Sequence, residues 1–125
     1  MKIKNIQKFI IDSKCTIRDC MKMIDDNGHG IIIVYKNDNI FGIITDGDIR
    51  RAILNEVDLS SEIKNITNTK FIYTSSEYEK YEINQIFNNS NIRHLPLVNN
   101  GKLEGLIFKE NYFKNKNKSK NGNSL

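Results

Sequence analysis

The stretch that decides the fold reads Gly42-Ile43-Ile44-Thr45-Asp46-Gly47-Asp48-Ile49-Arg50-Arg51. Its apolar first part belongs to a strand predicted over 40–45, which ends at Thr45. A glycine-containing turn then leads into a helix predicted over 46–54. The side chains expected to face the core from that helix are Ile49, Ala52 and Ile53. The stretch therefore predicts a strand–helix corner that carries polar side chains.

The residues before this corner predict another helix and another strand. Thr16 can cap a helix, with Asp19 at the third helical position completing a variant capping box, and 27–28 (Asn-Gly) stop it. The run 31–35 is continuously apolar, which predicts a strand buried on both faces. Residues 36–39 predict a turn between that strand and the next.

The same pattern occurs twice in the chain. An offset of 63 residues brings 13–50 onto 76–113 without a gap, and apolar positions agree better than residue identities do. The second copy predicts a helix over 77–89, strands over 95–98 and 103–108, and a last half-helix through Tyr112, after a short strand over 71–73. Each repeat needs its partner to bury its sheet, which is the usual physical reason for duplication.

We therefore predict an α/β (α+β) module of two β-α-β-β-α motifs, packed through their sheets about a pseudo-twofold. The expected boundaries are 1–113 for the module, with the first motif at about 3–57 and the second at about 63–113. The polar, Lys- and Asn-rich tail 114–125 is expected to be disordered.

The net charge of +4 comes from this tail, which carries four lysines and no acid. The basic balance is therefore no evidence of a nucleic-acid-binding face, and no nucleic acid partner is expected. Cys15 and Cys20 match no zinc spacing and fit a reduced cytoplasm. No apolar stretch approaches the length of a membrane span, so we expect a cytoplasmic protein without a membrane partner.

The polar residues at the corner suit a small ligand. Thr45 and Asp48 lie three residues apart and can both face a molecule over the strand end. A carboxylate there suits a vicinal diol such as that of ribose, because its two oxygens can accept from adjacent hydroxyls. Unpaired N–H groups at the helix start could reach a phosphate.

A phosphate at this corner needs a basic group nearby, because Asp46 and Asp48 together would repel it. Arg93 and His94, just before the second copy's buried strand, are the best candidates. The pair 50–51 is nearer in sequence, but these arginines lie in the helix and at least one is expected to point to solvent.

These motifs resemble those of the CBS domain family. The segment 42–48 matches the pattern Gly-h-h-Thr/Ser-x-x-Asp, where h is hydrophobic, and Arg93-His-Leu-Pro matches the basic-basic-h-Pro entry to the second motif's strand. The string Thr-Asp-Gly-Asp-Ile-Arg-Arg is most similar to the CBS pair attached to bacterial sugar-phosphate nucleotidyltransferases, and a similar string occurs in sugar-phosphate isomerases.

The resemblance implies a regulatory module that senses an adenine nucleotide (AMP, ADP, ATP or S-adenosylmethionine) or a nucleotide sugar, and that forms a homodimer. It assigns ribose contacts to Thr45 and Asp48, base packing to Ile43 and phosphate contacts to Arg93 and His94. The remaining expected ligand contacts are Asp46 and Thr16. No required cofactor and no metal are expected, and the implied partner is an attached or separate sugar-nucleotide enzyme.

The second copy departs from the family pattern. Phe108 stands where Thr is expected and Asn111 where Asp is expected, so at most one competent ribose site is predicted per chain. No catalytic set of residues is found, and no Gly-rich phosphate loop follows Phe113, so the chain is not expected to be an enzyme. It would be the regulatory part of a nucleotidyltransferase, or a protein that has lost its enzyme.

Alternatives stay open from sequence alone. Asp46 and Asp48 could serve only a helix cap and a solvated turn, or hold a divalent metal. Arg93 could form a salt bridge to either carboxylate, and His94 could be a satisfied strand-entry residue. The whole module could be a dimerisation scaffold that binds nothing, or the regulatory module of a sugar-phosphate isomerase.

Overall fold

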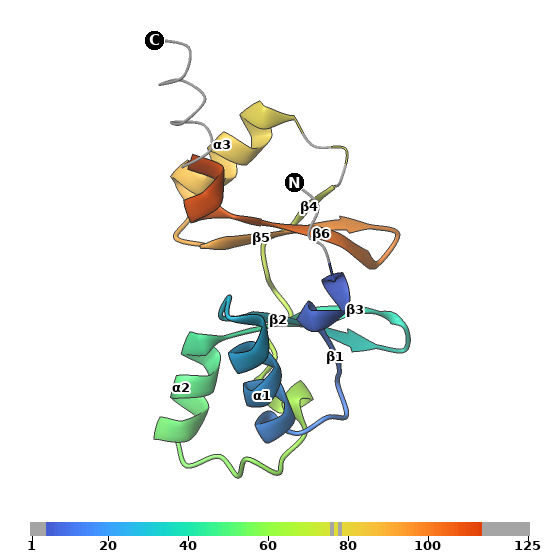
Figure 1. Cartoon of the computed structure of the whole chain (residues 1–125), viewed down its shortest axis with the longest axis vertical. Coiled ribbons are helices and arrows are strands. Elements are labelled where there is room, and N and C mark those ends of the chain that lie inside the picture. Colours follow the sequence, from blue (N-terminus) through green and yellow to red (C-terminus); the bar gives the residue numbers. More distant parts are fainter. Residues whose placement is uncertain (1–4, 76, 78, 114–125) are drawn as a thin grey trace. The chain divides into compact units, whose positions relative to one another are not determined.

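The computed structural model of the chain describes residues 5–75, 77 and 79–113, and the chain divides into two compact units at Phe71/Ile72. Each unit is a three-stranded mixed sheet with helices against one face (Figure 1). The two β-α-β-β-α motifs predicted from the sequence are confirmed. The predicted tail 114–125 lies outside the described residues.

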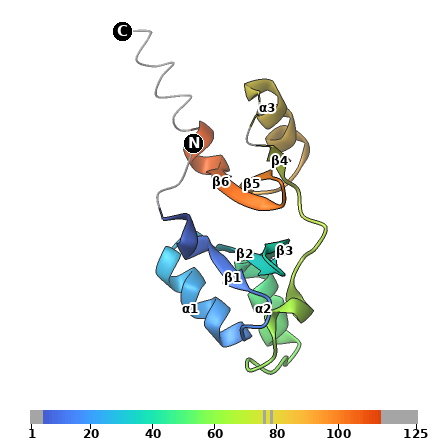
Figure 2. The same cartoon turned by 90° about the vertical axis from the view of Figure 1, so that its right-hand side faces the viewer.

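The first unit contains the sheet β1-β2-β3, with β1 parallel and β3 antiparallel to the central strand. Both longer helices lie on the same face of this sheet (Figure 2). Its elements in chain order are the 3-10 helix Ile6–Phe9, β1 (Ile10–Asp12), α1 (Ile17–Asn27), β2 (Ile31–Lys36), β3 (Asn39–Thr45), α2 (Asp46–Leu54) and the 3-10 helix Ile63–Ile66.

Helix α1 begins and ends where the sequence predicts. The Thr16 hydroxyl accepts a hydrogen bond from the Asp19 N–H at 3.1 Å, and the Asp19 carboxylate accepts one from the Thr16 N–H at 3.1 Å. Hydrogen bonding to Thr16 holds the pKa of the Asp19 carboxyl below its ordinary value. The bond with the Thr16 backbone contributes most, and interaction with the Thr16 side chain contributes next. Gly28 ends the helix at φ 70°, a left-handed conformation that glycine adopts without strain.

The core of the first unit is built on β2, of which residues 31–34 are fully buried. Alternate side chains point to opposite faces of a strand, so burial of four in succession confirms a strand buried on both faces. The cluster on the helix side consists of Ile11, Ile17, Cys20, Ile24, Ile32, Val34, Ile44, Ile49 and Ile63. This cluster fixes α2, and with it the polar corner, against the sheet.

The second unit repeats the first in backbone detail. Its elements are β4 (Thr74–Ser75), α3 (Lys80–Asn89), β5 (His94–Asn99), β6 (Lys102–Phe108) and a helical turn over 109–113. The pairing Ile31↔Thr45 recurs as His94↔Phe108, and the bulge at Val34/Tyr35 recurs at Leu97/Val98. The two hairpins therefore keep the same register at the offset found in the sequence.

Two expectations are wrong. Ile53 is not inward-facing but 49% exposed, because the buried stripe of α2 runs through Ile49 and Ala52 and Ile53 lies about 100° further round the helix. The short strand of the second motif is Thr74–Ser75 rather than 71–73. The apolar side chains of 71–73 suggested a strand there, but the residues that pair in parallel with Leu97 and Val98 are Thr74 and Ser75.

Candidate functional site

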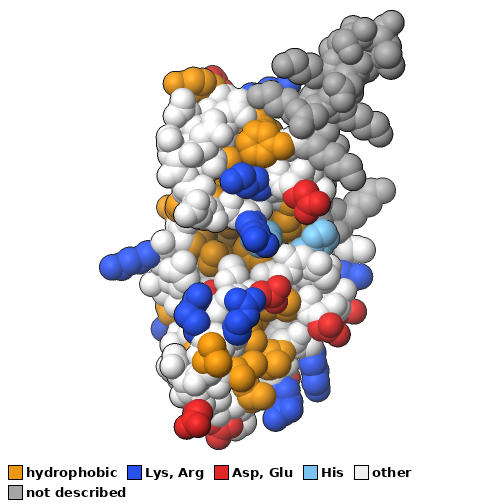
Figure 3. Space-filling model, turned by 90° about the vertical axis from the view of Figure 1, so that its left-hand side faces the viewer, with side chains coloured by type: hydrophobic (Ala, Val, Ile, Leu, Met, Phe, Trp, Pro, Cys, Tyr) orange, Lys and Arg blue, Asp and Glu red, His pale blue; other side chains and the backbone are white. Residues whose placement is uncertain are grey.

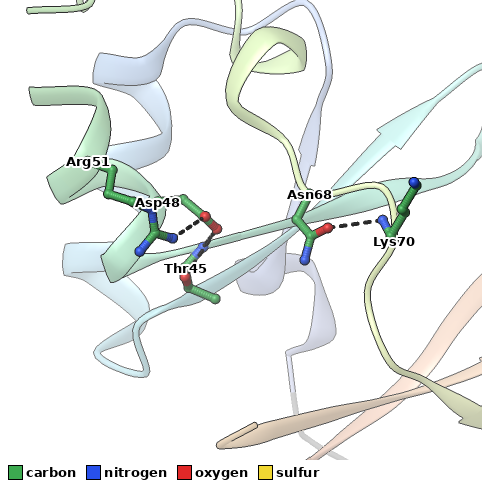
Figure 4. Close-up of polar contacts among 5 residues, drawn as sticks. All are labelled: Thr45, Asp48, Arg51, Asn68 and Lys70. Atoms are coloured by element: carbon green, nitrogen blue, oxygen red, sulfur yellow. Dashed lines mark hydrogen bonds and ion pairs between the residues drawn. The ribbon is translucent and has the colours of Figure 1, made fainter. Parts of the chain in front are cut away.

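The corner between β3 and α2 holds the Thr45 and Asp48 side chains together. Thr45 is the N-cap of α2 and Asp48 its third residue. The Thr45 N–H donates to Asp48 Oδ2 at 2.9 Å and the Thr45 hydroxyl donates to the same oxygen at 3.1 Å (Figure 4). The capping arrangement weighed from the sequence is therefore present, and it fixes the carboxylate at the strand end.

Arg51 is a further member of this corner, which the sequence analysis weighed together with Arg50 but set behind Arg93 and His94. Its Nη2 lies 2.7 Å from Asp48 Oδ1, with 66% of the Arg51 side chain exposed and 19% of the Asp48 side chain. The signal was available, because residues three apart face each other on a helix. Both carboxylate oxygens of Asp48 thus have partners within the first unit.

Asp46 is held by the loop before β2. The Asp46 N–H donates to the Gly30 carbonyl at 3.1 Å, and a Cβ built on Gly30 would lie 2.6 Å from Asp46 Oδ2. Gly30 also has φ +70°, so its backbone conformation favours glycine, while a Cβ there would only push the Asp46 side chain aside. The Asp46 carboxylate is exposed and lies against bare backbone.

The segment around Asn68 covers the outer edge of β3 beside Ile43. The Ile43 N–H donates to the Asn68 carbonyl at 3.0 Å, and the Asn68 N–H donates to the Ile43 carbonyl at 2.9 Å. Asn68 Oδ1 accepts from the Lys70 N–H at 3.0 Å. A Cβ on Gly42 would lie 2.4 Å from the Asn68 carbonyl oxygen, so Gly42 makes this close approach possible. The sequence did not predict this bridge.

Thr16 is placed away from the corner. Asp12 at the end of β1 pairs with Tyr35, whereas Thr45 pairs with Ile31 at the other end of β2. Thr16, which follows β1 and caps α1, therefore lies at the opposite end of the sheet from Thr45. Its role as a ligand contact stays a prediction.

The second unit has no comparable carboxylate corner among its described residues. The Phe108 ring occupies the position equivalent to Thr45 and packs edge-to-face on the His94 imidazole, with ring centroids 5.6 Å apart. Asn111, which replaces Asp48, is exposed, and the Arg93 carbonyl accepts from the Lys109 N–H at 2.9 Å. The phosphate-binding roles of Arg93 and His94 stay predictions.

A polar hollow of about 240 Å³ lies elsewhere in the first unit. Its lining holds three lysines and three acids, so the formal charges balance. The lining residues are Asp12, Ser13, Lys14, Lys36, Asn37, Asp38, Glu62 and Lys64. These surround the turn end of the β2–β3 hairpin, five strand residues from Ile31, or about 17 Å, so the hollow is separate from the Thr45 corner.

Other chemistries find little support in the described part of the chain. No group of three or more His, Cys, Asp or Glu side chains there could hold a metal ion. Burial raises the pKa of the Cys20 thiol to about 12, which makes it a neutral core side chain. None of the helices in the described ranges combines the length and hydrophobicity that crossing a bilayer requires.

Comparison with curated proteins finds relatives that are mostly longer than this chain. An uncharacterized 17.7 kDa protein of Acidianus ambivalens is 27% identical over 107 residues, covering 84% of this chain and 65% of its own length. A probable arabinose 5-phosphate isomerase of Haemophilus influenzae is 46% identical over 35 residues, covering 28% of this chain and 10% of its own length.

Solved structures match over most of the chain. A CBS-domain protein of Burkholderia ambifaria has a TM-score of 0.75 and 27% identity, covering 86% of this chain and 80% of that protein. A CBS domain protein of Pyrobaculum aerophilum complexed with AMP has a TM-score of 0.72 and 22% identity, covering 86% and 88%.

The family model for the CBS domain matches the chain twice, over residues 3–55 and 63–114. These two segments contain the repeated hairpins and the two strand–helix corners described above. The chain therefore belongs to the CBS domain family and consists of a tandem CBS pair.

Proposed function

We propose that this CBS pair is a regulatory module whose first motif binds an adenine nucleotide through Thr45 and Asp48. The observation that carries the proposal is the fixed, partly buried carboxylate of Asp48 at the end of β3, with no counterpart in the second motif. Similarity in fold to a CBS protein complexed with AMP supports an adenine nucleotide as the ligand class.

The acceptor capacity of the corner fits a ribose. A carboxylate has about four lone-pair positions, and the described partners of Asp48 use three of them. The Thr45 hydroxyl donates its proton to Asp48, and its oxygen also accepts from the backbone of Asp48 in the capping box, so one lone pair remains to accept from a ribose hydroxyl. Two adjacent hydroxyls could therefore donate to the Thr45 oxygen and to Asp48 Oδ1, the oxygen that Arg51 also contacts.

The base would pack beside Ile43, which is half-buried and held by the Asn68 bridge. Because this bridge fixes the edge of β3, it gives the ligand a preformed surface. Regulation of an attached or partner enzyme requires that the ligand bind one conformation better than another. A sugar-phosphate nucleotidyltransferase remains the partner proposed from the motif string.

The test is thermal stabilisation by AMP, ADP, ATP, S-adenosylmethionine, GTP and nucleotide sugars. A ligand at 100 times its Kd should add about 2.7 kcal/mol to the free energy of unfolding and raise Tm by several degrees. Asp48→Ala and Thr45→Ala should abolish this shift, while Asn111→Ala, the matched position in the second motif, should leave it intact. No shift with any of these compounds would reject the proposal.

A second candidate function is a dimerisation scaffold. The apolar side chains Ile53 and Leu54 on α2 are 49% and 74% exposed, and Figure 3 shows hydrophobic side chains gathered on the face that carries this helix. A homodimer through α2 would cover them. Ile53→Glu with Leu54→Lys should then convert a dimer to a monomer in sedimentation velocity, whereas a wild-type monomer would remove this candidate.

A sugar-phosphate isomerase is the alternative partner, and the short stretch of identity with the Haemophilus influenzae protein supports it. Mixing the chain with purified isomerase or nucleotidyltransferase and measuring turnover with and without AMP would separate the two partners.

A further inference from the structure

The carboxylate proposed to bind the ribose is already engaged by Arg51. Arg51 Nη2 lies 2.7 Å from Asp48 Oδ1, while Asp48 Oδ2 bonds to Thr45. Figure 4 shows the guanidinium turned back toward the carboxylate from further along α2. A ribose hydroxyl that donates to Asp48 Oδ1 must therefore compete with Arg51 for that oxygen.

Gly47 makes room for this guanidinium. A Cβ built on Gly47 would lie 3.3 Å from Arg51 Nη1 and 3.5 Å from Nη2, so the guanidinium rests on bare backbone at the first turn of α2. The same turn carries the Asp46 and Asp48 carboxylates. Arg51 thus holds a cation against Asp48, one of the two carboxylates that would otherwise repel a ligand phosphate.

The contact is also easy to exchange. The Arg51 side chain is 66% exposed, and ion pairs of exposed side chains are weak because water and salt screen them. A guanidinium, however, matches a phosphate as well as a carboxylate, because it can donate two parallel hydrogen bonds to either group. Leaving Asp48 for a ligand phosphate therefore replaces one ion pair by another.

We propose that Arg51 makes this site selective for phosphorylated ligands, by competing with the ribose for Asp48 and by transferring its guanidinium to the phosphate of a bound nucleotide. The proposal rests on the proposed function of the Thr45–Asp48 corner. A nucleoside must displace Arg51 and offers it no new partner. A nucleotide also displaces it but supplies an anion in return.

The two parts of the proposal have separate signatures. Competition for Asp48 weakens the binding of nucleoside and nucleotide alike, so it changes both affinities by the same factor. The contact with phosphate strengthens only the nucleotide, so it changes the ratio of the two affinities. Removing Arg51 should therefore tighten adenosine binding and lower the preference for AMP.

The experiment measures Kd for adenosine and for AMP by calorimetry with the wild-type chain, Arg51→Ala and Arg50→Ala. Arg50 is the matched control, because it is exposed on the same helix and makes no side-chain hydrogen bond or ion pair within the described residues. In Arg51→Ala, adenosine should bind about twofold to fivefold more tightly and the AMP preference should fall by about fivefold. Arg50→Ala should change neither quantity by more than about twofold.

Unchanged or weaker adenosine binding in Arg51→Ala would overturn the competition, and an unchanged AMP preference would overturn the phosphate contact. Either result leaves the proposed function standing as long as Asp48→Ala abolishes AMP binding. If the wild-type chain binds neither of these compounds nor any other compound of the thermal series, the proposed function itself fails, and the inference fails with it.

Discussion

The two CBS motifs share a backbone and differ at the positions that could do chemistry. Both hairpins keep the same register and the same bulge. The first motif ends its last strand with Thr45 and holds Asp48 in the following helix, whereas the second ends it with Phe108 and has Asn111. Duplication therefore preserved the fold in both copies, because packing depends on the apolar pattern, while a polar corner depends on individual residues.

The same contrast holds at the first helix of each motif. Thr16 caps α1 with its side chain, but the equivalent residue at α3 is Glu79, which makes no side-chain cap bond. The third helical residues are both acidic, Asp19 and Glu82. The second motif thus has half of a capping box, and the two copies serve as internal controls for each other.

The largest effect should come from giving the first corner the residues of the second. Thr45→Phe with Asp48→Asn removes the charge and the hydroxyl, so stabilisation by AMP should vanish entirely, a loss of about 2.7 kcal/mol at 100 times Kd. Thermal unfolding with and without AMP measures it. If the double variant still responds to AMP, the ligand binds outside the first corner, and the two motifs do not differ in ligand binding at this position.

A smaller loss should follow from filling the close approach at β3. Gly42→Ala places a methyl group 2.4 Å from the Asn68 carbonyl oxygen, which must move, and should lower the free energy of unfolding by about 1–3 kcal/mol. Gly47→Ala is the matched control, because its methyl group meets only the mobile end of Arg51 at 3.3 Å. Chemical denaturation of both variants should show a loss only for Gly42→Ala.

The caps of α1 and α3 should respond in opposite directions. Thr16→Ala removes a side-chain cap and should cost about 1 kcal/mol of stability, while Glu79→Thr completes a capping box with Glu82 and should add about 0.5–1 kcal/mol. Urea denaturation midpoints would show both shifts. A destabilised Glu79→Thr variant would mean that α3 does not start at Lys80 in solution.

The smallest effect is a pH dependence that only the first cap should show. The pKa of Asp19 is lowered in the folded chain, so its carboxylate contributes stability that is fully present above the unfolded value of about 3.8 and is lost as pH falls through the lower folded value. The stability difference between wild type and Asp19→Asn should therefore be constant near pH 6 and shrink below pH 3.8. Chemical denaturation of both chains at several pH values tests this. The same stability difference at a pH about one unit below 3.8 as at pH 6 would contradict it.

Much of the fold could be read from the chain. The apolar run at 31–35, the cap at Thr16 and the turn glycines are local signals, and each leads to the structure that physical chemistry assigns to it. The two errors concern features that depend on contacts with other segments of the chain. The first strand of the second motif was predicted too early in the chain, because the residues before it are apolar. Ile53 was predicted to face the core, although the buried face of α2 is narrower than the helix's apolar pattern.

The candidate site divides in the same way. Thr45 and Asp48 were identified from the motif, and the helix start that brings them together is a local consequence of sequence. Asn68 could not be found, because its bridge to Ile43 joins residues that are far apart in the chain and uses only backbone groups. Arg51 was visible as a residue three positions from Asp48, but its rotamer was not.

By itself, then, the sequence determined the duplicated motif, the helix caps, the buried strands and the loss of the second polar corner, since these follow from side-chain type and spacing. Only the tertiary structure decided which residues cover the edge of β3, which glycines permit close approach and what Asp48 bonds to. Those features depend on where backbone segments meet in space, and no periodicity along one chain encodes that meeting.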